Sequence, residues 1–233
     1  MEEAFVSWSG GKDSCLAYYR AVASGIKVRY LLNMVTEEGK WSRSHGLSAE
    51  LLRMQAEALG IPLVQQRATD NNYETEFKKA IKAFKKEGIT SGIFGDIDFN
   101  EHRQWIDRVC AAGGITPRLP LWMKNQEKIL RDFIDLGFES VIVATNADFL
   151  GEEWLGRKID SAFLADLKEL RKTNNITPCG EAGEYHTYVI NGPLFGKRVE
   201  IKKANKELKD GHWFLRITQC ELKSKRRSSQ KGK

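Results

Sequence analysis

A glycine-rich hexapeptide near the N-terminus has the residue types of a phosphate-binding loop. Ser9-Gly10-Gly11-Lys12-Asp13-Ser14 follows the apolar run 4–8 and precedes a helical pattern that stops at Gly25. Where a strand passes into a helix, unpaired backbone N–H groups and the positive end of the helix dipole meet. Glycines let the backbone approach an anion, and the Lys12 ammonium adds a positive charge. The hexapeptide therefore predicts a phosphate site formed by Ser9, Gly10, Gly11, Lys12 and Ser14. Asp13 either caps the helix or coordinates Mg²⁺, and we favour the functional role.

The order of residues distinguishes this loop from two common nucleotide motifs. A Walker A loop needs a glycine five residues before its Gly-Lys pair, where this chain has Val6. The dinucleotide fingerprint G-x-G-x-x-G is also absent. The hexapeptide instead resembles the PP-loop of ATP pyrophosphatases, which cleave ATP between the α- and β-phosphates. A flexible surface turn is the plain alternative, and the flanking strand and helix weigh against it.

A second group of reactive side chains lies in Gly180-Glu181-Ala182-Gly183-Glu184-Tyr185-His186-Thr187. Its two carboxylates stand three residues apart among glycines, with His186 and Thr187 beside them. They could hold an ammonium ion, orient an amine nucleophile, or bind Mg²⁺ together with pyrophosphate. The spacing does not choose among these roles. A purely structural role also stays open, because Gly-Glu pairs begin ordinary strands.

Alternating strand and helix patterns place the hexapeptide in an α/β fold. Strand-like runs at 28–36, 63–64, 91–95 and 140–145 alternate with helical patterns at 47–58, 73–84, 98–110 and 129–136. The run 140–145 is continuously apolar, which is typical of a parallel strand covered on both faces. We therefore expect a doubly wound, mostly parallel sheet with ligands at the carboxyl ends of its strands. The loops at those ends are 9–14, 34–46, 95–98 and 145–154.

The chain changes character after the breaker at 177–180. Strand-type runs at 185–190, 198–202 and 213–222 follow it, separated by turn sequences, and predict a smaller C-terminal α+β portion. We expect a nucleotide-binding domain over 1–150, an acceptor domain over 151–222 and a basic, disordered tail over 223–233. The aromatic run 213–215 could pair with a second copy as easily as with the core, so a homodimer stays open.

The excess positive charge is confined to the C-terminus. The net charge is +6, and residues 223–233 hold six Lys or Arg and no acid, so the rest of the chain is neutral. The tail could contact RNA through phosphate attraction, but a solvated end is the simpler interpretation, and we expect no specific nucleic acid. No apolar stretch approaches the roughly 20 residues of a membrane span. Four scattered cysteines suggest reduced thiols, so we expect a cytoplasmic protein with no membrane contact.

Several segments in the same order resemble the diphthine–ammonia ligase family, whose members are PP-loop ATP pyrophosphatases. Besides the two groups above, they are Gly95-Asp96-Ile97 with Glu101-His102-Arg103, Leu119-Pro120-Leu121-Trp122 and Trp154-Leu155-Gly156-Arg157. The resemblance covers the chain to about residue 222. Ala182 replaces the glycine or asparagine that is usual at this position of the 180–187 motif. This difference affects the assignment of the substrate that accepts the ammonia more than the assignment of ATP.

The resemblance implies an ATP- and Mg²⁺-dependent amide ligase with a Rossmann-like fold. The carboxylate of diphthine, a modified histidine on elongation factor 2, would be adenylated with loss of pyrophosphate. Ammonia would then displace AMP to give diphthamide. Elongation factor 2 and ammonium are the implied partners.

The resemblance and the positions at strand ends also assign site residues. Catalytic roles fall to Lys12, Asp13, Glu181 and Glu184, and the metal role to Asp13. Nucleotide binding falls to Ser9, Gly10, Gly11, Lys12, Asp13, Ser14, Met34, His45, Gly95 and Asp96. Acceptor binding falls to Arg157, Glu181, Glu184 and Thr187. A surface role for His45, an ion pair for Arg157 and structural roles for His102 and His186 stay open.

Two further functions remain as alternatives. One is a PP-loop ATP pyrophosphatase that acts on a different carboxylate or on an RNA base. The other is a module that binds nucleotide without turnover, against which the intact Lys12, Asp13 and paired glutamates argue.

Overall fold

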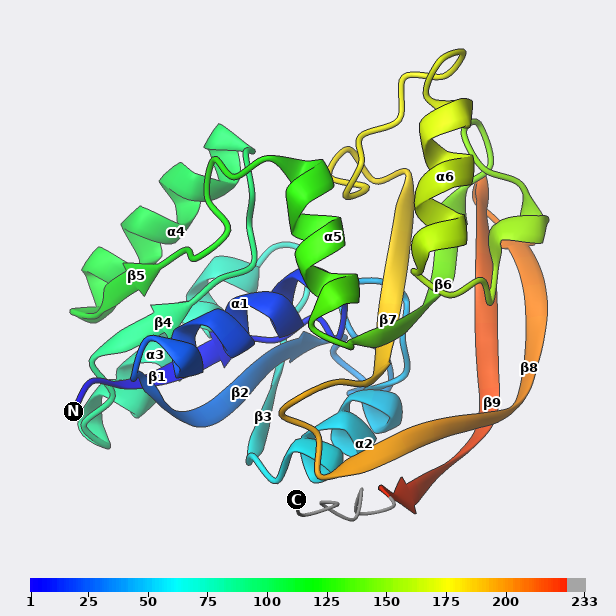
Figure 1. The fold of residues 1–233 in the computed structure, drawn as a ribbon. Helices are drawn as coiled ribbons and strands as arrows, with labels where there is room; N and C mark the ends of the chain where they lie inside the picture. The colour runs from blue at the N-terminus through cyan, green and yellow to red at the C-terminus, as the bar shows by residue number, and fades with distance from the viewer. Residues whose placement is uncertain (226–233) are drawn as a thin grey trace, which may run out of the picture.

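The computed structural model describes residues 1–225 and contains two β-sheets that lie side by side (Figure 1). The first sheet has five parallel strands in the order β3-β2-β1-β4-β5. Its strands and helices alternate as β1 (Glu3–Ser7), α1 (Lys12–Ala23), β2 (Lys27–Val35), α2 (Ala49–Leu59), β3 (Leu63–Arg67), α3 (Tyr73–Lys86), β4 (Ser91–Ile93), α4 (Asn100–Gly113) and β5 (Thr116–Arg118). The predicted doubly wound α/β fold is confirmed.

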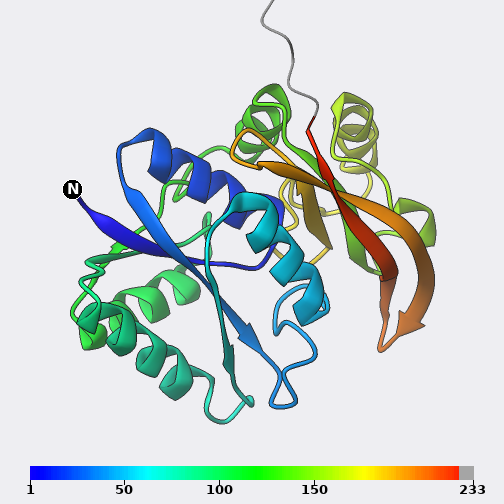
Figure 2. The same ribbon diagram turned by 90° about the horizontal axis from the view of Figure 1, so that it is seen from below.

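Helices cover both faces of this sheet (Figure 2), because its central strand β1 carries apolar side chains on both faces. Successive residues of β1 point to opposite faces. Phe5 packs in one cluster with Phe77 of α3, and Ala4 and Val6 pack in the other with Leu16 of α1. All of these side chains are almost fully buried. These two clusters of buried side chains fix the strands in place, so that the carboxyl ends of β1, β2 and β4 lie at the same edge of the sheet.

Helix starts differ in how their free N–H groups are satisfied. The side chains of Ser48, Asn125 and Asp160 cap α2, α5 (Gln126–Asp135) and α6 (Ser161–Leu170). The residue before α1 is Gly11, which has no side chain to cap with. The N-terminus of α1 is therefore left for a partner from elsewhere in the chain, or for an anion.

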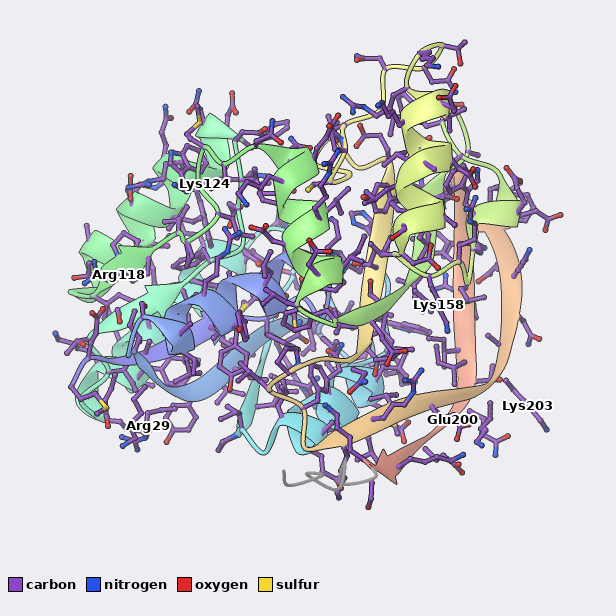
Figure 3. The ribbon with its side chains drawn as sticks, viewed as in Figure 1. Arg29, Arg118, Lys124, Lys158, Glu200 and Lys203 are labelled. Carbon is purple, nitrogen blue, oxygen red and sulfur yellow. The ribbon has the colours of Figure 1, made fainter. Side chains whose placement is uncertain are left out.

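The second sheet has four strands in the order β7-β6-β9-β8. They are β6 (Glu139–Asn146), β7 (Tyr185–Asn191), β8 (Lys197–Lys209) and β9 (His212–Ser224), with a 3₁₀ turn (Glu152–Trp154) and α6 between β6 and β7. Strand β8 forms an outer edge, on which Glu200 and Lys203 lie (Figure 3). Trp213 and Leu215 of β9 pack against the chain's own core.

The prediction that 140–145 forms a parallel strand is wrong. Strand β6 pairs antiparallel with β7 and with β9. Both of its faces are nevertheless covered, as the burial of the neighbouring Ile142 and Val143 shows. A continuous apolar run reports burial of both faces, and that burial does not determine the direction of the neighbouring strands.

The change of sheet comes earlier than residue 150. It lies between β5 and β6, so β6 groups with the C-terminal strands and not with the expected nucleotide domain. Strand β9 runs to Ser224, so the first residues of the expected disordered tail lie in a strand, and 226–233 lie outside the described residues. Within residues 1–225, no helix is both long and apolar enough to cross a membrane.

Candidate active site

A cavity of about 470 Å³ opens at the carboxyl ends of β1, β2 and β4, where the segment before β7 closes it from the other sheet. This is the edge at which ligands bind in open α/β sheets. The structure brings most of the predicted site residues to its lining: Ser9, Lys12, Asp13, Ser14, Met34, His45, Gly95, Asp96, Glu181 and Thr187. Residues from both ends of the sequence therefore share one cavity.

The loop 9–14 is shaped by close backbone contacts. Gly10 has φ +79°, and a Cβ there would lie 2.5 Å from Leu52 Cδ2 and 2.7 Å from Gln55 Oε1. A Cβ on Gly11 would lie 2.4 Å from His45 Cε1. Gly10 thus lies close against α2, and Gly11 lies close against His45, while Ser9 and Lys12 on either side of them line the cavity.

Lys12 is held as a buried ammonium at the start of α1. Its Nζ lies 2.7 Å from Asp13 Oδ2, donates to the Cys179 carbonyl and sits 5.1 Å from the centre of the Tyr185 ring. Burial opposes the charge, but the Asp13 carboxylate outweighs it, with Tyr185 and Cys179 adding to the effect, and raises the pKa of Lys12. The site therefore keeps a fixed positive charge where a phosphate would enter.

One carboxylate oxygen of Asp13 has no hydrogen-bond partner among the described residues. Oδ2 accepts from Lys12, while Oδ1 is buried and has no hydrogen-bond partner. Among the described residues, no three His, Cys, Asp or Glu side chains converge on a point that could hold a metal. Mg²⁺ commonly binds through one or two carboxylates plus substrate phosphates and water. Asp13 Oδ1 fits that arrangement, so the residues present suit Mg²⁺ that arrives with a nucleotide.

Glu181 projects a carboxyl group of unusual basicity into the cavity. Burial raises its pKa to about 8, with the Asp13, Asp96 and Asp98 carboxylates adding to the effect and Lys12 opposing it. A carboxyl group that titrates near neutral pH can hold a cation when ionised and accept a proton from it. Glu181 is thus suited to an amine or ammonium nucleophile.

Glu184 occupies a different position from the one that the motif suggested. It is 0% exposed, and its carboxylate accepts from the Thr177 backbone N–H and from Thr177 Oγ1, the latter at 3.0 Å. Thr177 Oγ1 in turn accepts from the Glu181 N–H at 2.8 Å. Glu184 does not line the cavity, so in place of the predicted catalytic and substrate-binding role we propose a positioning role, in which Glu184 holds the turn that presents Glu181.

The structure also separates Arg157 from the other predicted residues. Its guanidinium donates to Asp166 Oδ2 at 2.6 Å and lies 4.4 Å from the Trp154 ring, away from the cavity lining. Its carbonyl accepts from the Ile142 N–H, which ties the segment to β6. The ion-pair alternative describes the contacts of the Arg157 side chain, which does not line the cavity.

One wall of the cavity consists of aromatic residues that sequence reasoning assigned to helix cores or did not single out. Tyr73 of α3 and Trp105 of α4 line it with their ring centroids 5.9 Å apart, and Phe94 follows β4. Met34, predicted near the adenine, lies on the same lining. A flat, apolar base fits such a wall. Helical periodicity marks these residues as inward-facing but does not distinguish a core from a cavity.

Gln55 is a second residue that sequence reasoning missed. It is 0% exposed on α2, and its amide is fully used. Nε2 donates to the carbonyl oxygens of Gly10 at 2.9 Å and Val189 at 2.7 Å, while Oε1 accepts from Trp8 Nε1 at 3.0 Å. The sequence signal for Gln55 was a polar residue among the apolar positions of the buried face of α2. Gln55 connects Trp8, which directly follows β1, with the phosphate loop and β7.

The chain is similar to one family of known proteins over most of its length. The family model "Diphthamide synthase N-terminal domain" matches residues 2–117, and "Diphthamide synthase C-terminal domain" matches 125–224. Diphthine–ammonia ligase of Rattus norvegicus is 26% identical over 238 residues, covering 92% of this chain and 88% of that protein. The enzyme of the same name from Schizosaccharomyces pombe is 28% identical over 237 residues, covering 91% of this chain and 38% of its own length.

A solved structure described as a predicted subunit of tRNA methyltransferase from Methanocaldococcus jannaschii DSM aligns with a TM-score of 0.44 at 15% identity. That alignment covers 82% of this chain and 98% of the other, and a similarity this low carries no weight for function. The two family models together span nearly all of the described residues, and the unmatched residues between them, 118–124, run from the end of β5 to just before the start of α5. On these matches, the chain belongs to the diphthamide synthase family.

Proposed function

We propose that this protein is an ATP-dependent amide ligase that converts the diphthine carboxylate of elongation factor 2 into the diphthamide amide. Family membership supports the reaction class. The observation that carries the proposal is that the loop 9–14 and Glu181 line one cavity, because ligation needs the nucleotide and the nucleophile in contact with the same carboxylate. A cytoplasmic location belongs to this proposal.

In the first step, a carboxylate oxygen of the acceptor attacks the α-phosphorus of ATP. The bond from that phosphorus to the oxygen bridging to the β-phosphate breaks, and pyrophosphate leaves with the electron pair. The Lys12 ammonium and the positive end of the α1 dipole stabilise the charge that develops on the departing phosphates. Mg²⁺, when bound beside Asp13 Oδ1, supplies further neutralisation of that charge.

In the second step, ammonia attacks the acyl carbon of the mixed anhydride, and AMP leaves. Ammonium must first lose a proton to become nucleophilic. Glu181 is the residue we assign to hold ammonium and accept that proton, because its carboxyl group lines the cavity and titrates near neutral pH. The aromatic wall with Tyr73 and Trp105 receives the adenine.

The nucleotide product tests the proposal. The protein is incubated with ATP labelled on the α-phosphate, Mg²⁺ and ammonium, with or without diphthine-bearing elongation factor 2. We expect labelled AMP only with the acceptor, together with amidation of the acceptor. AMP formed with some other carboxylate would retain the pyrophosphatase and reject diphthine, whereas ADP would contradict the assignment of the loop.

A matched pair of lysine variants locates the activity. Lys12→Met removes the buried ammonium of the loop and should abolish AMP formation. Lys124→Met removes an exposed lysine in the connection before α5 and should leave it unchanged (Figure 3). Equal activity of the two variants would place the chemistry away from this loop.

A further inference from the structure

Two histidines from opposite parts of the chain stack against each other beside the phosphate loop. His45 lies in the connection between β2 and α2, and His186 lies in β7. Their ring centroids are 4.5 Å apart and their planes are inclined by 19°. Both line the cavity together with Lys12. The steps proposed above do not use either imidazole.

The chain presents His45 to the loop through an unfavourable backbone conformation. Its φ is +61°, a region that non-glycine residues seldom occupy, and Gly46 follows with +62°. Arg216 of β9 donates to the Gly46 carbonyl at 3.2 Å, and the Phe214 ring packs on Gly46. The imidazole is thereby pressed over Gly11, in the space that any side chain there would fill.

One ring nitrogen of the pair has no hydrogen-bond partner among residues 1–225. His45 Nδ1 is buried without a hydrogen-bond partner. Such an atom inside a cavity is a polar group that awaits a ligand. The ligand that the surrounding groups select is an anion, because the Lys12 ammonium and the N-terminus of α1 lie beside the rings.

The groups that face the two rings keep them neutral while no anion is bound. Burial lowers the pKa of His45 well below its usual value, and His186 and Lys12 lower it further, while the Thr187 backbone acts in the opposite direction. Burial, Lys12 and His212 of β9 lower the pKa of His186 to about 4. Arg216 beside Gly46 adds a further positive charge on this side. A multiply charged anion placed among these groups reverses the electrostatic balance and favours the imidazolium forms.

We propose that His45 and His186 form a proton-accepting wall of the polyphosphate site, and that at least one of these imidazoles takes up a proton from solvent when the β- and γ-phosphates bind. This inference rests on the proposed binding of ATP at the loop. Imidazolium donates a charged hydrogen bond to the departing pyrophosphate and so stabilises it as it leaves. No covalent bond to either histidine is involved.

Isothermal titration calorimetry with inorganic pyrophosphate measures the proton uptake directly. Titration at pH 7 in two buffers of different ionisation enthalpy yields the number of protons taken up per ligand. We expect wild type to take up about one proton more than His45→Gln/His186→Gln, whose value corrects for titration of pyrophosphate itself. Relative to that variant, the wild-type affinity should then fall about tenfold for each unit of rising pH. Equal proton numbers would overturn the inference.

A control variant and a spectroscopic readout guard against misfolding. His212→Gln leaves both stacked rings in place and should retain the uptake, whereas loss of uptake in this variant would overturn the assignment. In wild type labelled with ¹⁵N-histidine, pyrophosphate should shift the ring nitrogens of His45 or His186 to imidazolium positions, and unchanged signals would also overturn it. Proton uptake without AMP formation would retain the inference and reject the ligase, and AMP formation without uptake would do the reverse.

Discussion

The backbone N–H of Lys12 donates to the Thr187 hydroxyl at 3.0 Å, so a residue of β7 caps the first turn of α1. Helix α1 has no side-chain cap of its own. The contact joins the phosphate loop to the last residue of the Gly180–Thr187 motif. Any change in the position of β7 therefore reaches the N-terminus of α1, where the phosphate is expected.

Replacing Thr187 by valine should destabilise the fold and disturb the loop. Thr187 is 2% exposed, so the variant leaves the Lys12 N–H buried without a partner, at a cost of about 1–3 kcal/mol. Thr187→Ser keeps the hydroxyl and should lose far less stability. Urea unfolding measures both variants, and equal stability of the two would show that the hydroxyl does not cap α1.

Replacing Gln55 by leucine should raise KM for ATP and lower the free energy of unfolding. The variant keeps the approximate volume but leaves the buried Trp8 indole N–H without its acceptor and releases Gly10 and Val189. We expect KM for ATP to rise roughly tenfold and the free energy of unfolding to fall by about 2 kcal/mol. Gln104→Leu, at an exposed position of α4, is the control. An unchanged KM in a folded Gln55→Leu would contradict the positioning role.

Replacing Glu184 by alanine should act through the turn that carries Glu181. The variant removes both acceptors of Thr177, and we expect a loss of about 2–3 kcal/mol together with lower amidation. Glu184→Gln retains one acceptor and should keep partial activity. Glu181→Gln should lower amidation by about 100-fold or more while the protein stays folded. If Glu184→Gln instead lost all activity with its stability intact, Glu184 would have a direct role in the chemistry.

Thermal unfolding against pH tests the environment of Glu181. The pKa of Glu181 in the folded protein, raised to about 8, lies above its ordinary value of 4.5, so the native state binds the proton more tightly than the unfolded state. The free energy of unfolding of wild type should therefore fall as pH rises from about 4.5 to 8. Glu181→Gln cannot titrate at this position, so its free energy of unfolding lacks this dependence on pH. The melting temperature of Glu181→Gln minus that of wild type should grow over this window. If the difference between the two melting temperatures did not depend on pH, the pKa of Glu181 would not be raised in the folded protein.

Local sequence was sufficient for the phosphate loop and for the α/β alternation. A strand that ends in a glycine turn and passes into a helix places free N–H groups at one point, whatever the rest of the chain does. The carboxyl ends of parallel strands then meet at one edge, so Met34, Gly95 and Asp96 could be assigned to the cavity from their positions at or just after the ends of strands. These features depend on the backbone within a few residues.

Tertiary structure decided the features that depend on which segments pack together. The burial of both faces made β6 apolar without determining its antiparallel neighbours. Glu181 and Glu184 share one motif, yet Glu181 lines the cavity and Glu184 is buried against Thr177. The contact of His45 with His186 joins residues that are distant in sequence. Such contacts arise from the packing of the two sheets, which no local pattern encodes.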